Sequence, residues 1–194
     1  MTESSDRGGQ ADQLSQAERL VQLEHRLQAL EDEVEVTRLI LSYGPLVDSG
    51  DADAVAAIWE PDGVYDVDEL VMNGREQIAA MVTSEFHQHW ITNGCAHVIG
   101  APRVSVNGDD AVAVCYSLMI VTGDDGFVVR RATANHWRLR RGADGWLVTT
   151  RTSRVLDGRA ESPELLASGM ASGADPTEET ERRTTSAISP TSCT

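Results

Sequence analysis

Four segments in the second half of the chain are rich in β-branched residues, and glycine-containing turns separate each segment from the next. The segments are residues 96–106, 111–122, 127–141 and 146–156. The turns between them are Asn107-Gly108-Asp109, Gly123-Asp124-Asp125-Gly126 and Gly142-Ala143-Asp144-Gly145. Short turns of this composition join antiparallel strands. The pattern therefore predicts a meander of four long antiparallel strands.

The first half of the chain has helical periodicity instead. Apolar side chains recur at alternating steps of three and four residues, with Thr37 filling one position: Leu20, Leu23, Leu27, Leu30, Val34 and Leu41. This spacing predicts one long amphipathic helix over residues 13–42. Gly44-Pro45 should kink or end the helix, because proline lacks an amide donor and its ring crowds the preceding turn. The stripe is compatible with a helix docked on the body, a short pairing helix or an autonomous coiled coil.

Shorter elements and a tail complete the expected organisation. Asp51 is suited to cap a short helix that runs to Trp59, a strand pair is expected around residues 64–72, and a further helix around residues 75–86. After Asp157 few large apolar residues remain, which predicts a tail with a weak helix over 163–170 and disorder from Pro176. We therefore expect a disordered N-terminus (1–12), an amphipathic helical extension (13–34), one domain (35–157) and a flexible tail (158–194).

Composition argues against several classes of function. With 194 residues and 41% hydrophobic content, the chain is long enough to bury one proper core. Its net charge of −15 opposes binding to nucleic acid and to anionic membranes. The absence of lysine excludes Schiff-base chemistry and a lysine-dependent phosphate loop. With no long apolar run and no basic, apolar leader, a cytoplasmic location is expected. The three cysteines lack metal-like spacing, and Cys95 and Cys115 are expected to be buried free thiols.

The order of these elements, and several stretches of the sequence, resemble a known family. The stretches are SYGPLVDSGDADAVAAIWEPDGVYDV, NGREQI, HVIGAPRVSVNGDDAVAVCYSL and ANHWRLRRGADGWLVTTRT. Over roughly residues 35–157 they are similar to SnoaL-like domains, which share their fold with nuclear transport factor 2 and scytalone dehydratase. The resemblance implies an α+β fold in which a curved antiparallel sheet wraps around helices as a cone-shaped barrel. Since this fold carries many activities, the pocket must decide the function.

The same resemblance implies three catalytic residues. Scytalone dehydratase and the bile-acid dehydratases carry a tyrosine and an aspartate on the first helix and a histidine on the first long strand. Tyr43, Asp48 and His97 match that pattern in order and approximate spacing. Five residues turn an ideal helix about 140° past one full turn, so Tyr43 and Asp48 share a face only if a kink at Pro45 re-aims Asp48.

Further residues are expected to line the pocket. Tyr65 resembles the second tyrosine of the scytalone enzyme and Asn135 its asparagine on a later strand, whereas the second strand histidine of that enzyme has no match near Thr122. Trp90 and Tyr116 are expected as additional substrate contacts.

Alternation along residues 127–141 predicts which side chains face the core. It places Phe127, Val129 and Asn135 inward, His136 outward, and Arg131 at the cavity mouth or its rim. An inward amide must find a hydrogen-bonding partner, a water or a ligand, because an unpaired buried amide lowers stability.

The histidines near residue 90 have two interpretations. His87 and His89, with Trp90, are expected to form a mobile segment over the pocket mouth. The alternative is a metal site that combines His87, His89 and His97. Because the resembled dehydratases need no metal, neither a metal nor another cofactor is expected.

Imidazole, phenol and carboxylate together can dehydrate a β-hydroxy carbonyl compound. In this interpretation His97 removes the α-proton and returns it to the leaving oxygen, Asp48 orients the imidazole, and Tyr43 and Tyr65 donate to the carbonyl. The expected function is a cofactor-independent dehydratase for a hydrophobic polyketide, steroid or aromatic hydroxy-ketone. Two alternatives stay open: an isomerase or cyclase with Asp66 or Asp68 as base, and a non-catalytic ligand-binding or assembly module.

Residues 111–122 are apolar on both strand faces, which predicts that the outer face of the sheet is covered as well as the inner one. Members of the resembled fold commonly pair through this outer face. A homodimer or larger homo-oligomer is therefore expected, with the N-terminal helix as an additional contact.

Overall fold

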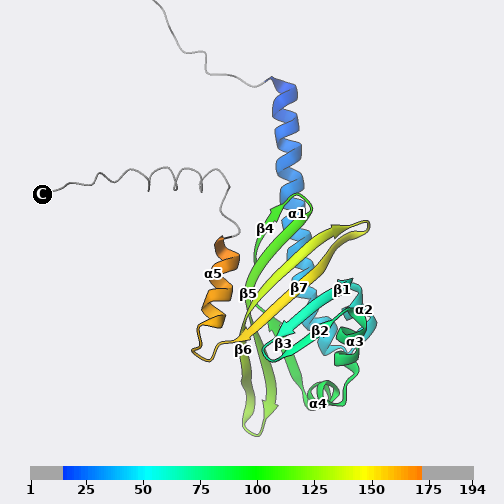
Figure 1. Ribbon diagram of the computed structural model, residues 1–194, viewed down its shortest axis with the longest axis vertical. Coiled ribbons are helices and arrows are strands. Elements are labelled where there is room, and N and C mark those ends of the chain that lie inside the picture. Colours follow the sequence, from blue (N-terminus) through cyan, green and yellow to red (C-terminus); the bar gives the residue numbers. More distant parts are fainter. Residues whose placement is uncertain (1–14, 172–194) are drawn as a thin grey trace, which may run out of the picture.

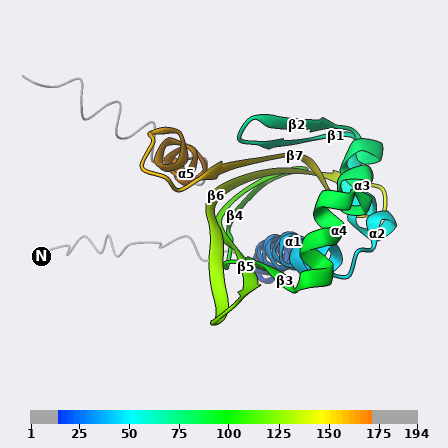
Figure 2. The same cartoon turned by 90° about the horizontal axis from the view of Figure 1, so that it is seen from below.

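The computed structural model describes residues 15–171 and places a curved sheet around one long helix. The helices are α1 (Gln16–Asp48), α2 (Ala52–Ala57), α3 (Arg75–Thr83), α4 (Glu85–Asn93) and α5 (Glu161–Ala171). The strands are β1 (Trp59–Val67), β2 (Leu70–Asn73), β3 (Cys95–Ile99), β4 (Arg103–Asn107), β5 (Asp110–Gly123), β6 (Gly126–Gly142) and β7 (Gly145–Val155). Figure 2 shows the sheet curving around α1, with α3 and α4 beside it. The expected α+β cone is confirmed, with a sheet that does not close.

The sheet has seven strands in the order β2-β1-β7-β6-β5-β3, and β4 also pairs with β5. The antiparallel meander holds for β5, β6 and β7. The strand predicted over residues 96–106 is instead divided into β3 and β4, both paired with β5. The division falls at Gly100-Ala101-Pro102, where proline cannot donate to a ladder. β1 pairs with β7 in parallel, which the sequence pattern did not predict.

Helix α1 continues through Pro45 to Asp48, so it does not end at Gly44-Pro45, which was one of the two outcomes predicted there. The last turns bury Ile40, Tyr43 and Val47 against the body, and this packing offsets the hydrogen bond that proline cannot donate. The helix begins at Gln16 rather than at residue 13, because Ser15 and Glu18 form a reciprocal capping box. The predicted disordered residues 1–12 lie outside the described part of the chain.

The helix predicted over residues 75–86 is two helices. Helix α3 ends at Thr83, and Ser84 adopts an extended backbone and caps α4 by accepting a hydrogen bond from the amide of His87. His87, His89 and Trp90 therefore lie on a helix, in place of the mobile segment that was expected. The cap explains the change, since serine at this position satisfies a free amide of a new helix start.

Helix α5 contains the helix that was predicted over residues 163–170. It packs against the outer face of β5 and β6, a contact that was not predicted. Gly169 allows this packing, because a Cβ there would lie 2.0 Å from Val114 Cγ1. His136 points outward as predicted, yet it is buried, since α5 lies against it. Part of the outer sheet face is thus covered by the chain itself. The tail predicted to be disordered from Pro176 lies outside the described residues.

The hairpin between β5 and β6 extends beyond the body, as Figure 1 shows. Arg130 is an extra residue in the β5–β6 ladder, which pairs Met119 with Arg131 but Ile120 with Val129. Phe127 and Val129 are exposed, contrary to the inward placement that simple alternation predicted. Among the described residues, no helix is both long and apolar enough to cross a membrane.

Candidate active site

A cavity of about 150 Å³ lies between α1, α4 and the concave face of the sheet. Its wall is mainly apolar and its polar groups converge from several elements. The apolar lining comprises Val47, Val67, Leu70, Met72, Met81, Ile99, Leu118 and Met119. The polar and aromatic lining comprises Tyr43, Tyr65, His87, His97, Ser117, Arg131, Thr133, Arg151 and Ser153. Apolar walls with a few convergent polar groups are typical of a small-molecule site.

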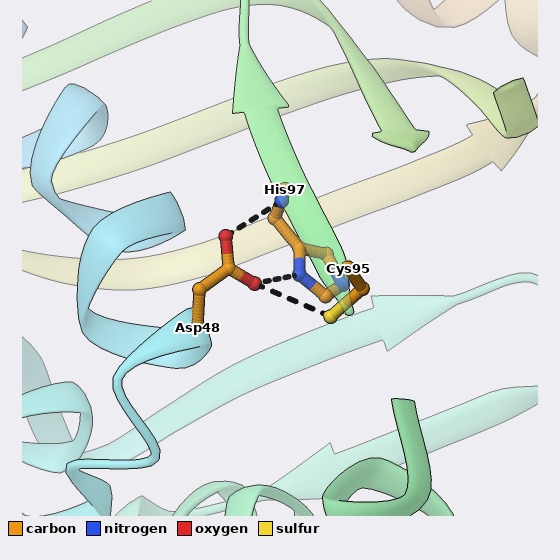
Figure 3. A group of neighbouring side chains, drawn as sticks. All are labelled: Asp48, Cys95 and His97. Atoms are coloured by element: carbon orange, nitrogen blue, oxygen red, sulfur yellow. Dashed lines mark hydrogen bonds and ion pairs between the residues drawn. The ribbon is translucent and has the colours of Figure 1, made fainter. Parts of the chain in front are cut away.

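Asp48 and His97 form a close pair at the edge of this cavity (Figure 3). Asp48 Oδ1 lies 2.6 Å from His97 Nδ1, and Asp48 Oδ2 accepts a hydrogen bond of 2.7 Å from the His97 amide. Burial opposes the charged carboxylate, yet the hydrogen bonds from the ring and amide of His97 hold the pKa of Asp48 below its usual value. The carboxylate therefore engages Nδ1, and Nε2 is the nitrogen left for a molecule in the cavity.

Gly44 brings the helix and the strand together at this point. A Cβ on Gly44 would lie 2.1 Å from the carbonyl oxygen of His97, so only glycine permits α1 to approach β3 this closely. The approach explains how Asp48, at the end of α1, reaches His97 without sharing a helix face with Tyr43. Tyr43 lines the cavity, whereas Asp48 acts on it through His97.

His87 places a second imidazole in the cavity. Its ring stacks on that of His97, with centroids 5.6 Å apart. Burial lowers the pKa of His87, and the neighbouring His97 lowers it further. His87 Nε2 is buried and has no hydrogen-bonding partner among residues 15–171. A neutral histidine with an unpartnered ring nitrogen can hydrogen-bond to a ligand.

Arg151 is a buried cation that contacts three aromatic rings. Its guanidinium carbon lies 4.3 Å from the ring centroid of Tyr43, 4.7 Å from that of Tyr65 and 4.3 Å from that of Trp137. Only 3% of the residue is exposed. Within the described residues it forms no ion pair with a carboxylate, and its Nη1 has no hydrogen-bonding partner. An unneutralised guanidinium in a cavity wall favours an anionic or oxyanionic ligand atom.

Asn135 is fully buried and orients Arg151. Its Oδ1 accepts hydrogen bonds from Arg151 Nη2 at 2.8 Å and from Ser153 Oγ at 2.6 Å. Its Nδ2 donates to Ser117 Oγ at 2.9 Å. The inward amide thus has the partners that its burial requires. Because protein groups occupy both ends of the amide, Asn135 positions the cation instead of lining the cavity.

Tyr43 and Tyr65 lie next to each other in the cavity wall, with ring centroids 6.2 Å apart. Burial raises the pKa of Tyr43, and Tyr65 adds to this rise while Arg151 opposes it. Tyr43 therefore stays a neutral phenol that can donate a hydrogen bond.

Two predicted substrate contacts lie elsewhere. Tyr116 is 57% exposed on β5 and is not part of the cavity lining. Trp90 lines a shallow hollow beside the cavity mouth with Phe86 and Arg130, and this hollow shares His87 and His97 with the cavity.

Asp66 and Asp68, the candidate bases of the isomerase or cyclase alternative, form ion pairs with arginines. Asp66 accepts two hydrogen bonds from Arg154, and Asp68 pairs with Arg131 at the cavity wall. These arginines occupy carboxylate oxygens that a base would need to present to a substrate proton.

Asp48, Cys95 and His97 are the described residues whose ligand atoms lie close enough together to hold a metal ion (Figure 3). The alternative combination of His87, His89 and His97 does not form such a group among the described residues. Burial and the nearby Asp48 raise the pKa of Cys95 to about 11, so its thiol is protonated at neutral pH. Its Sγ lies 3.7 Å from Asp48 Oδ1. In this arrangement the protonated thiol donates a weak hydrogen bond to Asp48.

Sequence reasoning missed Arg151, and it placed His87 over the pocket mouth, whereas His87 lies in the cavity wall. Trp146 and Val148 are buried on β7, and strict alternation from them would turn Arg151 away from the core. The ladder shifts register here, pairing Arg138 with Thr150 but Leu139 with Val148, so Thr149 is an extra residue and Arg151 points inward. An arginine in the strand that also carries the buried Trp146 and Val148 was the available signal, and the bulge concealed its direction.

Comparisons with known proteins agree with this architecture. The family model of the SnoaL-like domain matches residues 28–152. An NTF2-like protein with a cystatin-like fold from Novosphingobium aromaticivorans is 40% identical; the match covers 76% of this chain and 96% of that chain, with a TM-score of 0.74. No protein with a curated description matches the chain.

Two more distant structures share the fold. A protein from Catenulispora acidiphila, solved in complex with S-DNPA, is 26% identical over 63% of this chain and 91% of that chain, with a TM-score of 0.56. ActVI-ORFA from Streptomyces coelicolor is 23% identical over 63% of this chain and 96% of that chain, also with a TM-score of 0.56. From its matching family model, its 40% identical structural relative and its sheet curved around α1, the chain belongs to the SnoaL-like family.

Proposed function

We propose that the protein is a cofactor-independent dehydratase that removes water from a hydrophobic β-hydroxy carbonyl compound. The observation that carries the proposal is the Asp48–His97 pair, 2.6 Å apart, on a cavity that also presents a buried guanidinium. A base and an electrostatic stabiliser for an enolate are the two groups that this reaction needs most. The apolar lining supports a hydrophobic substrate such as a polyketide, steroid or aromatic hydroxy-ketone.

In the first step, His97 Nε2 takes the proton from the carbon between the carbonyl and the hydroxyl-bearing carbon. The electron pair of that C–H bond moves onto the carbonyl oxygen and forms an enolate. Tyr43 and Tyr65 donate hydrogen bonds to this oxygen, and the charge of Arg151 stabilises it. Asp48 stabilises the imidazolium that His97 becomes.

In the second step, the enolate electrons form the carbon–carbon double bond and the C–O bond of the hydroxyl group breaks. Imidazolium His97 gives its proton to the departing oxygen, so that water leaves and neutral His97 is restored. No external reductant or oxidant is consumed. His87 lines the cavity and its Nε2 has no partner among the described residues, so in this mechanism it is the group proposed to accept a hydrogen bond from the substrate hydroxyl.

The ligand complex of the Catenulispora acidiphila protein lends further support, because a protein of this fold was solved with S-DNPA bound. The ion pairs of Asp66 and Asp68 weigh against either residue as the base of an isomerase or cyclase.

The test is turnover of a panel of hydrophobic β-hydroxy ketones with tetralone and steroid skeletons, followed by mass spectrometry. We expect the wild type to form products that have lost one water, and His97→Gln to lose this turnover by roughly 10²–10⁴-fold. His89→Gln is the matched control, since His89 lies on α4 near His87 but is exposed and outside the cavity lining.

Two other outcomes would favour the alternative functions. A product of unchanged mass would favour the isomerase or cyclase. No turnover, with equal ligand binding by wild type and His97→Gln, would favour a non-catalytic binding module.

A further inference from the structure

Helix α1 carries an exposed apolar stripe that the domain itself does not cover. It consists of Leu20, Leu23, Leu27, Leu30, Val34 and Leu41, each between 39% and 60% exposed. We call these six residues, with Thr37 completing the spacing, the α1 seam. Figure 1 shows the first half of α1 projecting beyond the sheet. A row of exposed leucines on a projecting helix is typical of a docking surface.

The seam lies on a different side of α1 from the body. The domain buries Asp32, Val36, Ile40, Tyr43 and Val47, and this stripe is centred roughly 150° around the helix from the seam. Val34, Arg38 and Leu41 are therefore exposed even where α1 contacts β3 and β4. A second helix can therefore pack along the whole seam. The two domains then lie on the outer sides of the helix pair.

The spacing of the seam is that of a heptad repeat. Leu20, Leu27, Val34 and Leu41 take position a, whereas Leu23, Leu30 and Thr37 take position d. The seam covers three heptads, a length of roughly 31 Å at 1.5 Å per residue. The helix starts just before it, at the capping box of Ser15 and Glu18. Packing on the body already orders its second half, which lowers the entropy cost of pairing so short a repeat.

The charges beside the seam select the partner and its direction. Positions g hold Arg19, Arg26 and Glu33, and positions e hold Glu24, Glu31 and Arg38. All six side chains are exposed, and none of them forms an ion pair within residues 15–171.

In a parallel pair of identical helices, each g position faces the e position five residues later on the other helix. The contacts are then Arg19 with Glu24, Arg26 with Glu31 and Glu33 with Arg38, all of opposite charge. An antiparallel pair sets e against e and g against g, and its contacts are mixed: Glu24 meets Glu31, of like charge, whereas Arg26 meets Glu33, of opposite charge. Only the parallel pair makes all of these contacts complementary.

We propose that α1 pairs with α1 of a second copy of this chain as a parallel, in-register two-stranded coiled coil. The pair forms a homodimer whose two cavities lie on opposite sides of the coiled coil. The interface does not use the outer sheet face, in contrast to the sheet-mediated pairing expected from the sequence.

The first experiment measures the mass of the full chain in solution by sedimentation equilibrium at micromolar concentration. We expect a dimer for the wild type and a monomer for the double variant L23E/L30E, which places charges in two d layers. Val21→Glu is the matched control, because Val21 is 50% exposed on the same helix but outside the seam, and it should stay dimeric. A monomeric wild type, or a dimer that persists in L23E/L30E, would overturn the proposal.

The second experiment tests direction by disulfide formation, with Cys193 replaced by Ser. Leu27→Cys should cross-link quantitatively under mild oxidation, since identical a positions face each other only in a parallel, in-register pair. Gln22→Cys, exposed and outside the seam, should cross-link far less. Loss of the dimer in L23E/L30E without cross-linking of Leu27→Cys would exclude the parallel arrangement. Far-ultraviolet circular dichroism of each variant separates loss of pairing from loss of folding.

Discussion

At the scale of single residues, the candidate site combines a common arrangement, the Asp48–His97 pair, with an uncommon one, the buried Arg151. The Asp48–His97 pair is the usual way to fix one ring nitrogen of a histidine and free the other. A buried arginine without a carboxylate partner among the described residues is unusual, since burying a charge costs stability unless it is paired. Three aromatic rings and Asn135 compensate the charge only in part. Such incomplete compensation is characteristic of functional sites.

The variant Arg151→Met separates function from stability. Under the proposed mechanism, we expect a loss of kcat by roughly 10²–10³-fold, the size seen when one oxyanion donor is removed. Thermal stability should stay within about 1 kcal/mol of the wild type or rise, because an unpaired buried charge is replaced by an apolar side chain of similar shape. Turnover and thermal unfolding of the same preparation give both quantities.

Arg151→Lys is the control for charge alone. It keeps the cation but loses the planar donors that reach Asn135, so it should recover part of the activity at most. Full activity in Arg151→Met would remove this residue from the mechanism.

Burial of His87 predicts how stability depends on pH. The pKa of His87 is lowered in the folded protein, so below its ordinary value of about 6.5 the unfolded chain binds a proton that the folded chain does not. The free energy of unfolding should therefore be highest above this value and decrease as the pH falls through it.

His136 contributes in the same direction, because burial beneath α5 lowers its pKa too. Urea unfolding between pH 5 and pH 8 measures the free energy of unfolding of the wild type, His87→Phe and His136→Phe. We expect this free energy to change less steeply with pH in each variant than in the wild type. If the free energy of unfolding of His87→Phe kept the pH dependence of the wild type, this histidine would titrate alike in the folded and unfolded states.

At the scale of secondary-structure elements, the site depends on the contact of α1 with β3. Gly44→Ala would place a Cβ 2.1 Å from the His97 carbonyl oxygen, and neither backbone can give way locally. We expect a loss of stability of about 1–3 kcal/mol, as for other overpacked cores, and a loss of turnover as the Asp48–His97 distance lengthens.

Pro45→Ala is the neighbouring control for this prediction. Residue 45 is exposed, and alanine restores the amide donor that the helix lacks there. Stability should stay equal or rise, with turnover unchanged. If Gly44→Ala matched Pro45→Ala in both properties, the close approach would not be what positions His97.

At the scale of the whole molecule, α5 is a separate layer on the outside of the sheet. A chain that ends after residue 157 should keep the cavity, since no residue of α5 lines it. It should lose stability, because Val114 and His136 would be exposed. Thermal unfolding and ligand binding distinguish the two effects. Loss of ligand binding at a temperature where the truncated protein is folded would mean that α5 shapes the cavity.

Much of this architecture could be predicted from local patterns. Turn residues and β-branched segments marked β5, β6 and β7, and apolar spacing marked α1, because hairpin turns and helical periodicity are encoded over a few neighbouring residues. Tyr43, Asp48 and His97 were selected through a family resemblance, and the structure brings Asp48 and His97 into contact. Their catalytic roles remain predictions.

The remaining features were decided by contacts between distant parts of the chain. Packing of Ile40 and Val47 carries α1 past Pro45, and one extra residue at Thr149 turns Arg151 into the cavity. Helix α4 brings His87 onto His97, and α5 covers His136. The sequence by itself determined the β5–β7 meander and the heptad spacing of α1, since both depend on short-range spacing. Only the tertiary structure decided which polar groups share the cavity, because that depends on register shifts and long-range packing.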